Sequence, residues 1–301
     1  MAASPYGCIA LLACLASTDA TAQQRRAMPG TRMIEVDGRA VRVVSRGLAD
    51  RKPGAPIVVF EAGAGNSLEV WGNILSHVAA FAPVVAYDRA GLGRSEWDNV
   101  PPTPEHVTAR LRRVLRQLGA TPPYVLVGYS WGGSLARYFA GDHPDDVAGI
   151  VFVDPGPIIT QSPADNLAPF NAVGAGKAGY DAYWSAIAAL FTRASPAVRA
   201  EFDVFRGLMD LEPEARRLRP VPGVPVVVIL AAKYLPLQGI RVPYDPRAHF
   251  EADVRHRIRM LQEWALASPR GTVVISNSTT HAVPREDPDL VVWAVKRVLS
   301  P

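Results

Sequence analysis

One serine has the neighbours in sequence that a covalent nucleophile requires. The segment Tyr124–Gly133 contains the pattern Gly128-x-Ser130-x-Gly132. An apolar, β-branched run ends at Gly128 and a helical pattern follows, so Ser130 lies at a junction of strand, tight turn and helix. A side chain at such a turn points out above the sheet, and the glycines leave room for the adjacent strand and helix. The pattern indicates a nucleophilic serine or, as the alternative, a serine that only caps a helix.

A serine hydroxyl becomes a strong nucleophile only when a base takes its proton, and histidine is the usual base. Among the six histidines of the chain, His281 lies in a loop after the last predicted strand. The carboxyl ends of parallel strands meet at one edge of a sheet, so that loop lies at the same edge as Ser130. His281 is therefore the predicted base. The other histidines are predicted at the surface or at helix ends: His77, His106, His143, His249 and His256.

The carboxylate that would orient His281 has two candidates, and a third possibility is that neither serves. Asp154 ends the predicted strand Gly149–Val153, whereas Asp245 lies in a long loop. A carboxylate that orients an imidazole must be held rigidly, and a strand end is better fixed than a loop. We therefore favour Asp154 over Asp245, although Asp154 could instead serve only a structural turn. Three later carboxylates are expected to serve the N-terminus of the last helix: Glu286, Asp287 and Asp289.

Short apolar runs alternate with helical patterns along the remainder of the chain. The runs are continuous rather than alternating in polarity, which is typical of strands covered on both faces in a parallel sheet. The predicted strands are Arg32–Val36, Ala40–Ser45, Ile57–Phe60, Val84–Tyr87, Tyr124–Gly128, Gly149–Val153, Val224–Leu230 and Thr272–Ser276. The predicted helices are Leu68–Phe81, Pro104–Leu118, Ser130–Gly141, Phe250–Ala267 and Pro288–Leu299. This alternation predicts an α/β fold with a doubly wound, mostly parallel sheet.

One segment, residues 156–221, breaks this rhythm. It has no strong strand, and it contains helical stretches at Tyr180–Phe191 and Pro196–Leu211. We interpret it as a helical cap inserted after the fourth central strand, so that residues 23–155 and 222–301 form the core. The aromatic residues of the cap are expected either to line an apolar substrate pocket or to hold the cap on the core: Phe170, Tyr180, Tyr183, Trp184 and Phe191.

The first residues have the pattern of an export signal. The apolar run Ile9–Ala16 precedes the small residues Ala20–Ala22, so residues 1–22 are predicted to be a signal peptide, although no Lys or Arg precedes the run. Both cysteines, Cys8 and Cys14, lie in this segment, so the mature chain would contain no thiol and no disulfide. We expect an exported protein, or a cytoplasmic one if this segment is not a signal.

Composition excludes several other classes of protein. Of 301 residues, 49% are hydrophobic and 20% are charged, which excludes a disordered chain. The net charge of +4 is scattered rather than gathered in a stripe, so nucleic-acid binding is not expected. No stretch of about 18 consecutive apolar residues exists, so no membrane span is expected. No His, Asp or Glu residues show the spacing of metal ligands, so neither a metal nor a cofactor is expected.

Five segments resemble the α/β-hydrolase fold superfamily, in its serine-hydrolase branch. They are Val58–Gly65, Tyr87–Ser95, Gly128–Gly133, Val151–Pro155 and the His281 loop with Asp287–Val291. The resemblance implies an oxyanion hole formed by the backbone N–H groups of Ala64 and Trp131, and a mainly architectural role for Asp88–Ser95. Ala62 is a departure, because many relatives have His there. The segment Ala231–Pro236 is another, because it lacks the acid that many relatives carry at that point; an acid from the earlier strand, as at Asp154, is a known variant.

The resemblance also implies a function. It points to a serine hydrolase that cleaves a carboxylic ester, a lactone or an amide through an acyl-enzyme on Ser130, with a small ester-like molecule as its substrate and no cofactor. A lyase or an acyltransferase could use the same scaffold and triad, and a non-catalytic binding protein of this fold is a further alternative.

Overall fold

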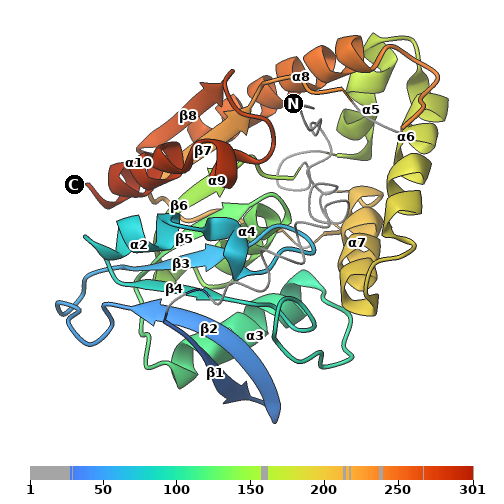
Figure 1. The fold of residues 1–301 in the computed structure, drawn as a ribbon. Coiled ribbons are helices and arrows are strands. Elements are labelled where there is room, and N and C mark those ends of the chain that lie inside the picture. The colour runs from blue at the N-terminus through green and yellow to red at the C-terminus, as the bar shows by residue number, and fades with distance from the viewer. Residues whose placement is uncertain are drawn as a thin grey trace, which may run out of the picture.

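A sheet of eight strands forms the centre of the protein (Figure 1). The structure is a computed structural model that describes residues 28–300 apart from residues 29, 157–161, 213–214, 217, 237–239 and 267. The predicted signal peptide, residues 1–22, lies outside the described residues with both cysteines. The strands are β1 (Thr31–Val36), β2 (Arg39–Arg46), β3 (Ile57–Glu61), β4 (Val84–Tyr87), β5 (Tyr124–Tyr129), β6 (Val147–Val153), β7 (Val226–Ala231) and β8 (Gly271–Ser276).

The order of the strands is β1-β2-β4-β3-β5-β6-β7-β8. The pairs β1/β2 and β2/β4 are antiparallel, and every other neighbouring pair is parallel. This arrangement confirms the predicted α/β fold with its mostly parallel sheet. Because β3, β5, β6, β7 and β8 run in one direction, the loops that follow them meet at a single edge of the sheet.

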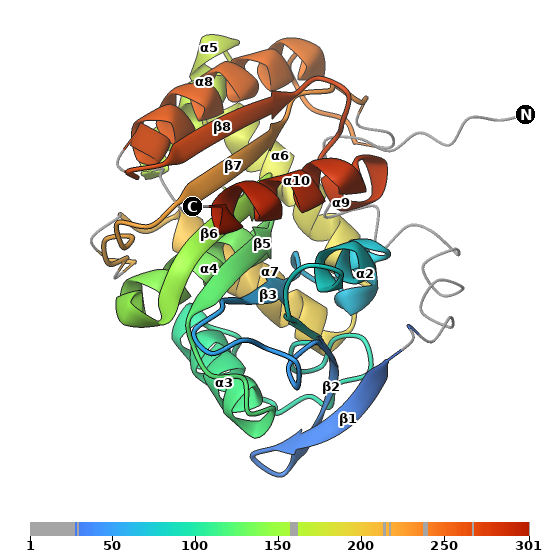
Figure 2. The ribbon, with the colours of Figure 1, turned by 90° about the vertical axis from the view of Figure 1, so that its left-hand side faces the viewer.

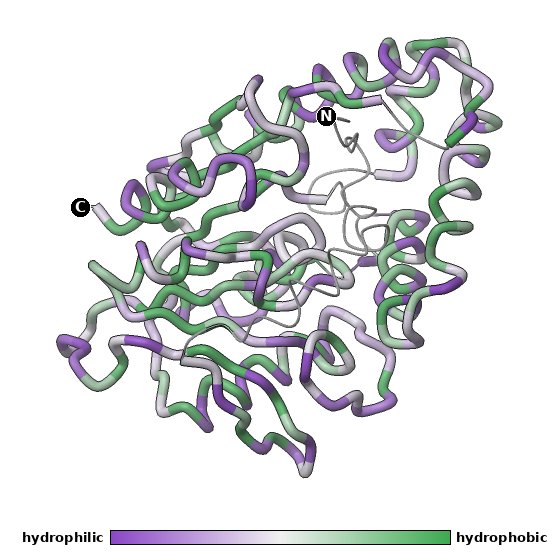
Figure 3. Tube along the Cα trace, viewed as in Figure 1, coloured by the Kyte–Doolittle hydropathy of each residue, from purple (hydrophilic) through white to green (hydrophobic). Residues whose placement is uncertain are grey.

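Helices cover both faces of the sheet (Figure 2). The helices are α2 (Ile74–Ala79), α3 (Pro104–Gln117), α4 (Trp131–Asp142), α5 (Pro163–Ala172), α6 (Gly176–Phe191), α7 (Pro196–Met209), α8 (Pro246–Leu266), α9 (Val283–Glu286) and α10 (Pro288–Leu299), with the 3₁₀ helices η1 (Leu68–Trp71) and η2 (Pro144–Asp146). Apolar side chains of α3, α4 and α8 pack on one face. Those of η1, α2 and α10 pack on the other, and the strands between the two layers are the most apolar part of the chain (Figure 3).

Two predicted helices have different bounds in the structure. The expected single helix Leu68–Phe81 is divided into η1 and α2, because Gly72 between them has φ +47°, a left-handed conformation that ends a helix. Helix α8 begins at Pro246 rather than at Phe250. Its first turn is stabilised by Asp245, whose Oδ1 accepts hydrogen bonds from two backbone N–H groups of that turn.

Three helices, α5, α6 and α7, lie between β6 and β7 and extend over the edge of the sheet where the loops meet (Figure 1). Helix α5 packs against α6 and α8. The α6 and α7 helices are joined by a stacked pair of rings, Phe191 and Phe202, whose centroids are 4.4 Å apart. Phe191 therefore holds the cap together. None of the helices in the described part of the chain is long and apolar enough to cross a membrane.

Candidate active site

Ser130 and His281 lie within hydrogen-bonding distance although 151 residues separate them. Ser130 stands between β5 and α4, and His281 stands in the loop between β8 and α9. The distance from His281 Nε2 to Ser130 Oγ is 3.0 Å. This is the geometry in which an imidazole can take the proton of a serine hydroxyl.

The turn that presents Ser130 is strained and tightly packed. Ser130 has φ +53° and ψ −119°, which an L-residue adopts only when the surrounding structure enforces it. A Cβ atom at Gly128 would lie 2.4 Å from Gly132 O, and one at Gly132 would lie 2.0 Å from Glu61 O. Only glycine fits at these two positions, because α4 begins in direct contact with the end of β3 and with its own preceding strand.

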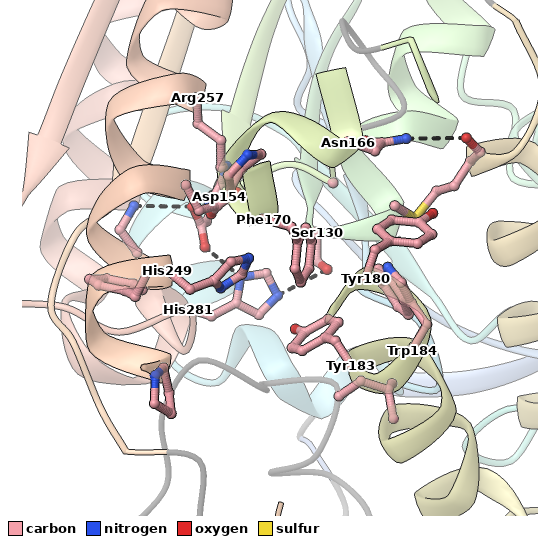
Figure 4. A pocket seen from close by; sticks show the side chains of 18 of the residues that line it. Ser130, Asp154, Asn166, Phe170, Tyr180, Tyr183, Trp184, His249, Arg257 and His281 are labelled. Atoms are coloured by element: carbon pink, nitrogen blue, oxygen red, sulfur yellow. Dashed lines mark hydrogen bonds and ion pairs between the residues drawn. The ribbon is translucent and has the colours of Figure 1, made fainter. Parts of the chain in front are cut away.

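A carboxylate holds the other nitrogen of the His281 ring. Asp154 Oδ2 lies 2.5 Å from His281 Nδ1, and Asp154 Oδ1 accepts hydrogen bonds from Ala231 N–H at 3.1 Å and from Arg257 at 2.8 Å. Arg257 also donates to Pro155 O at 3.1 Å. With both its oxygens engaged, Asp154 has a single orientation, and it fixes the ring so that Nε2 faces the serine (Figure 4).

The Asp154 carboxylate stays ionised because of its neighbours. It is 2% exposed, and burial alone would raise its pKa. The charges of Arg257 and His281, with the hydrogen bonds from His281 and Ala231, outweigh burial and lower the pKa to about 2. Asp154 therefore carries a negative charge throughout the pH range in which a neutral His281 could act as a base.

The loop that carries His281 is fixed by Glu286. Its carboxylate accepts hydrogen bonds from the Thr280 backbone N–H at 2.6 Å and from the Thr280 hydroxyl at 2.8 Å. Of the three carboxylates expected at the N-terminus of the last helix, Asp287 caps α10 through the Leu290 N–H and Asp289 lies in its first turn, but Glu286 does not serve it. Glu286 instead positions the residue next to His281, because α9 turns it back toward the loop.

The remaining sequence-predicted candidates lie elsewhere. Asp245 is exposed and caps α8, so the structure does not bring it to His281. His77 and His106 lie on α2 and α3, and His143 follows α4, all away from Ser130. The prediction of a surface or helix-end position is wrong for His256, which is 6% exposed in the middle of α8. His249 does lie near the start of α8, where it is half-buried and lines the pocket beside Ser130. Helix α8 packs against α5, which buries His256.

The two backbone N–H groups predicted to bind an oxyanion lie on neighbouring elements. Trp131 is the first residue of α4, where N–H groups have no partner within the helix. The Ala64 N–H has no backbone acceptor among the described residues. Ala64 and Trp131 belong to one buried apolar cluster. Because Gly132 lets α4 touch the end of β3, the loop after β3 is held against the N-terminus of α4.

A buried arginine holds that loop in place. Arg89 donates to Ala62 O at 2.6 Å and to Gly63 O at 2.7 Å, and it pairs with two carboxylates. Glu61 at the end of β3 is one, at 2.8 Å, and Glu201 on cap helix α7 is the other, at 2.5 Å. Burial raises the pKa of Glu61, whereas Arg89 remains charged because its two partners outweigh its burial. The segment Asp88–Ser95 is expected to be architectural. Through Arg89 it binds the loop after β3, which carries Ala64.

Glu201 connects the cap directly to the same loop. It is 2% exposed, and its Oε2 accepts a hydrogen bond from the Gly65 backbone N–H at 2.8 Å. Gly65 has φ +68° and directly follows Ala64. The cap therefore takes part in fixing the backbone that carries Ala64, one of the two predicted oxyanion donors.

A pocket with a volume of about 210 Å³ opens beside Ser130 and His281 (Figure 4). Tyr180, Tyr183 and Trp184 of α6 lie on one side of it, and Asp154, Arg257 and His249 lie on the other. Further apolar walls come from the cap and from α8: Phe170, Ile187, Phe205, Met209 and Phe250. Of the cap aromatics considered in the sequence, all but Phe191 line this pocket. Among the residues that the structure describes, no group of three or more His, Cys, Asp or Glu side chains could hold a metal ion.

Three charged residues at or near the site escaped the sequence analysis: Glu201, Arg257 and Asp253, of which the last two line the pocket. Each lies on a helix of the cap or on α8, and each looks in sequence like an ordinary solvent-facing charge. One signal was present for α8. Positions 249, 253 and 257 share one face of a helix, and two of them are charged.

The fold and the site match a known family. The sequence model of the alpha/beta hydrolase fold matches residues 55–282, which is most of the chain. The protein therefore belongs to the α/β-hydrolase family.

Known relatives are similar over shorter stretches. A haloalkane dehalogenase of Bradyrhizobium diazoefficiens is 33% identical over 40% of this chain and 40% of its own length. A lipase of Mycobacterium tuberculosis is 36% identical over 29% of this chain and 32% of its own length. The chain thus spans about one third to two fifths of the length of these curated relatives. The crystal structure of the enol-lactonase of Burkholderia xenovorans LB400 superimposes with a TM-score of 0.58 at 18% identity, over 90% of this chain and all of the other, and shows a shared fold.

Asp154→Asn tests which carboxylate orients His281. The amide cannot hold the imidazole in the required tautomer, so we expect kcat for an activated ester to fall by about 10³–10⁴-fold. The matched variant Asp245→Asn keeps a good helix cap, because Asn caps as well as Asp, and should change kcat by less than about threefold. Both are measured with a p-nitrophenyl ester. A larger loss in Asp245→Asn than in Asp154→Asn would contradict the assignment.

Gly132→Ala tests the packing of the serine turn. The new Cβ would lie 2.0 Å from Glu61 O, so the backbone must shift, and we expect the free energy of unfolding in urea to fall by about 3 kcal/mol. Gly207→Ala is the matched control, because this helical glycine of α7 has open space around it. The control should gain about 0.5–1 kcal/mol from helix propensity. Equal effects of the two substitutions would refute the close packing described for this turn.

Glu201→Ala tests the connection between the cap and the oxyanion loop. Removing the acceptor of the Gly65 N–H should lower kcat by about tenfold or more while KM changes little, because the loop acts on the transition state. Glu201→Gln retains an acceptor oxygen and should recover part of kcat. Breaking the buried pair with Arg89 should also cost about 3 kcal/mol of stability in the alanine variant. The control is Asp203→Asn, an exposed position of the same helix; a stability loss without a change in kcat would remove Glu201 from the site.

Proposed function

We propose that the protein is a serine hydrolase that cleaves a carboxylic ester through an acyl-enzyme on Ser130. One observation carries the proposal: Ser130 Oγ lies 3.0 Å from His281 Nε2, and the other ring nitrogen lies 2.5 Å from the ionised Asp154. A nucleophile, its base and the group that orients the base are thus in contact. Lactones and amides present the same carbonyl group and belong to the same proposal.

The steps follow from the contacts. His281 takes the proton of Ser130 as the serine oxygen attacks the carbonyl carbon of the substrate. The oxyanion accepts hydrogen bonds from the Ala64 and Trp131 N–H groups. Each such donor lowers the activation free energy by about 2.7–4 kcal/mol. The C–O bond to the alcohol then breaks, and His281 gives its proton to the leaving oxygen. A water molecule, deprotonated by His281, cleaves the acyl-enzyme by the same route and restores the Ser130 hydroxyl.

The identity of the nucleophile favours acyl transfer over displacement at a saturated carbon. A serine that displaced halide from an alkyl halide, or that opened an epoxide, would be left as an ether. Water does not hydrolyse an ether under mild conditions, so the enzyme would stop after one turnover. An acyl group on the same oxygen forms an ester, which His281 and water can cleave. Although one relative is named a dehalogenase, Ser130 supports an acyl substrate for this chain.

The environment of the pocket supports a small organic substrate. Its volume of about 210 Å³ and its aromatic walls suit an apolar acyl or alcohol group. The named activity of the lactonase that shares the fold is also one on a carbonyl group.

Ser130→Ala tests the proposal. With the nucleophile removed, we expect kcat for p-nitrophenyl acetate and butyrate to fall by about 10⁴-fold or more, because the base and the oxyanion hole alone give little rate. A fluorophosphonate probe should label the wild-type protein at Ser130, as read by mass spectrometry of the labelled peptide, and should not label the variant.

The outcomes separate the alternatives. Undiminished ester turnover in Ser130→Ala would refute a serine hydrolase. Absence of labelling in the wild type would favour a non-catalytic binding protein. Product analysis in the presence of an added alcohol would reveal an acyltransferase if the acyl group goes to the alcohol rather than to water.

A further inference from the structure

One wall of the pocket carries a row of polar side chains on α8. His249, Asp253 and Arg257 follow one another at a spacing of four residues, so they share a face of the helix, and all three line the pocket with Ser130. The opposite wall is aromatic and belongs to the cap. A substrate in this pocket therefore lies between rings on one side and the polar face of α8 on the other.

The carboxylate of Asp253 has no hydrogen-bond donor or ion-pair partner within 4 Å among the described residues, although it lies inside the pocket. Asp253 is partly exposed, and a partly desolvated carboxylate without a partner is stabilised when a cation or a hydrogen-bond donor binds it. Burial raises the pKa of Asp253; Arg257 opposes this effect, Asp154 adds to it, and His256 opposes it.

Two basic side chains near Asp253, Arg257 and His256, face other carboxylates. Arg257 donates to Asp154 and to Pro155 O. The Nε2 atom of His256 faces a carboxylate of α5, Asp165, at 3.9 Å. His249 adds no charge, because burial lowers its pKa to about 4 and leaves the ring neutral at pH 7. Among the described residues, the pocket thus presents a carboxylate that has no ion-pair partner within 4 Å and that a cation from another molecule can bind; Lys233, an exposed residue, also lines the pocket.

The aromatic wall suits a cation as well. Arg206 of α7 lies over the Trp184 ring at 4.7 Å and over the Tyr180 ring at 5.4 Å, so rings of this wall already hold one positive group on the side of α7. The faces of aromatic rings attract organic cations, and Tyr183 extends this wall along the pocket. Phe170 joins the two walls, because its ring packs on His249 with the ring centroids 4.1 Å apart.

We propose that Asp253 forms a subsite for a protonated amine of the substrate, so that the preferred substrates are esters that carry an ammonium group on an apolar or aromatic body. Asp253 binds the ammonium group, and the cap aromatics pack against the body. This inference rests on the proposed function for the position of the reacting carbonyl, because Ser130 and Asp253 line the same pocket. Binding of the amine itself does not depend on that function.

The experiment compares pairs of esters that differ only in charge. The p-nitrophenyl esters of 4-(aminomethyl)benzoate and 4-ethylbenzoate place ammonium or methyl at the same position on the acyl side. The acetates of 4-(aminomethyl)phenol and 4-ethylphenol do so on the alcohol side. Rates are divided by those of alkaline hydrolysis to remove differences in intrinsic reactivity. In at least one pair, wild-type kcat/KM should favour the ammonium ester by about tenfold or more.

Asp253→Asn should reduce this preference to about twofold or less while it leaves kcat/KM for the neutral ester within about threefold. Asp253→Leu is a second variant of similar size, and it should reverse the preference. The matched control is Glu251→Gln, which removes a carboxylate from an exposed position of the same helix and should keep the wild-type preference. Circular dichroism checks that each variant is folded.

A binding measurement separates this inference from the proposed function. Benzylammonium is titrated into the wild type and the variants by calorimetry, with benzyl alcohol as the neutral comparison. Binding of the cation that is lost in Asp253→Asn supports the subsite even if no ester is cleaved, in which case only the proposed function fails. No preference for the ammonium ester together with no binding of benzylammonium overturns the subsite. A preference that survives Asp253→Asn overturns it as well.

Discussion

The Asp154 carboxylate is the point on which the candidate site depends, because a histidine and an arginine share it. His281 takes one of its oxygens, and Arg257 takes the other together with the Ala231 N–H. The charge of Arg257 and the hydrogen bonds from His281 and Ala231 offset the cost of burying the carboxylate at the end of β6, and the three contacts leave it one orientation. The hydrogen bond between Nδ1 and Asp154 therefore also orients the His281 ring, so that Nε2 faces Ser130. Since Arg257 comes from α8, an element that lies beyond the cap in sequence also determines where the base points.

The oxyanion loop is held in the same manner, by a buried charge that connects distant segments. Arg89, beyond β4, binds the carbonyl groups of the loop after β3 and pairs with Glu201 of the cap, while Glu201 binds the next N–H of the loop. Hydrogen bonds to a charged group are about twice as strong as neutral ones, so these contacts hold the loop rigidly. Rigidity matters here because oxyanion donors lower a barrier only if they need not reorganise during the reaction.

The elements that the sequence analysis predicted well are those governed by local rules. Continuous apolar runs identified the strands, and Gly128 and Gly132 around Ser130 identified the turn, because only glycine fits there. The contributions that it missed depend on tertiary packing. The predicted helix Leu68–Phe81 is divided at Gly72 because that residue has a left-handed backbone conformation, which a hydrophobic pattern does not reveal. The roles of Arg257 and Glu201 depend on which face of a helix meets the core, and a charged residue on a mixed helix gives no sign of being buried.

The hydrogen bond between the Gly65 N–H and Glu201 has a consequence for the way a substrate reaches the pocket. If α7 moved away from the core to admit substrate, Glu201 would move with it. The oxyanion loop would then lose the hydrogen bond from the Gly65 N–H to Glu201 in each catalytic cycle. A substrate that enters while α7 stays in place leaves this restraint intact. The one bond thus couples any displacement of α7 to the stiffness of the loop after β3.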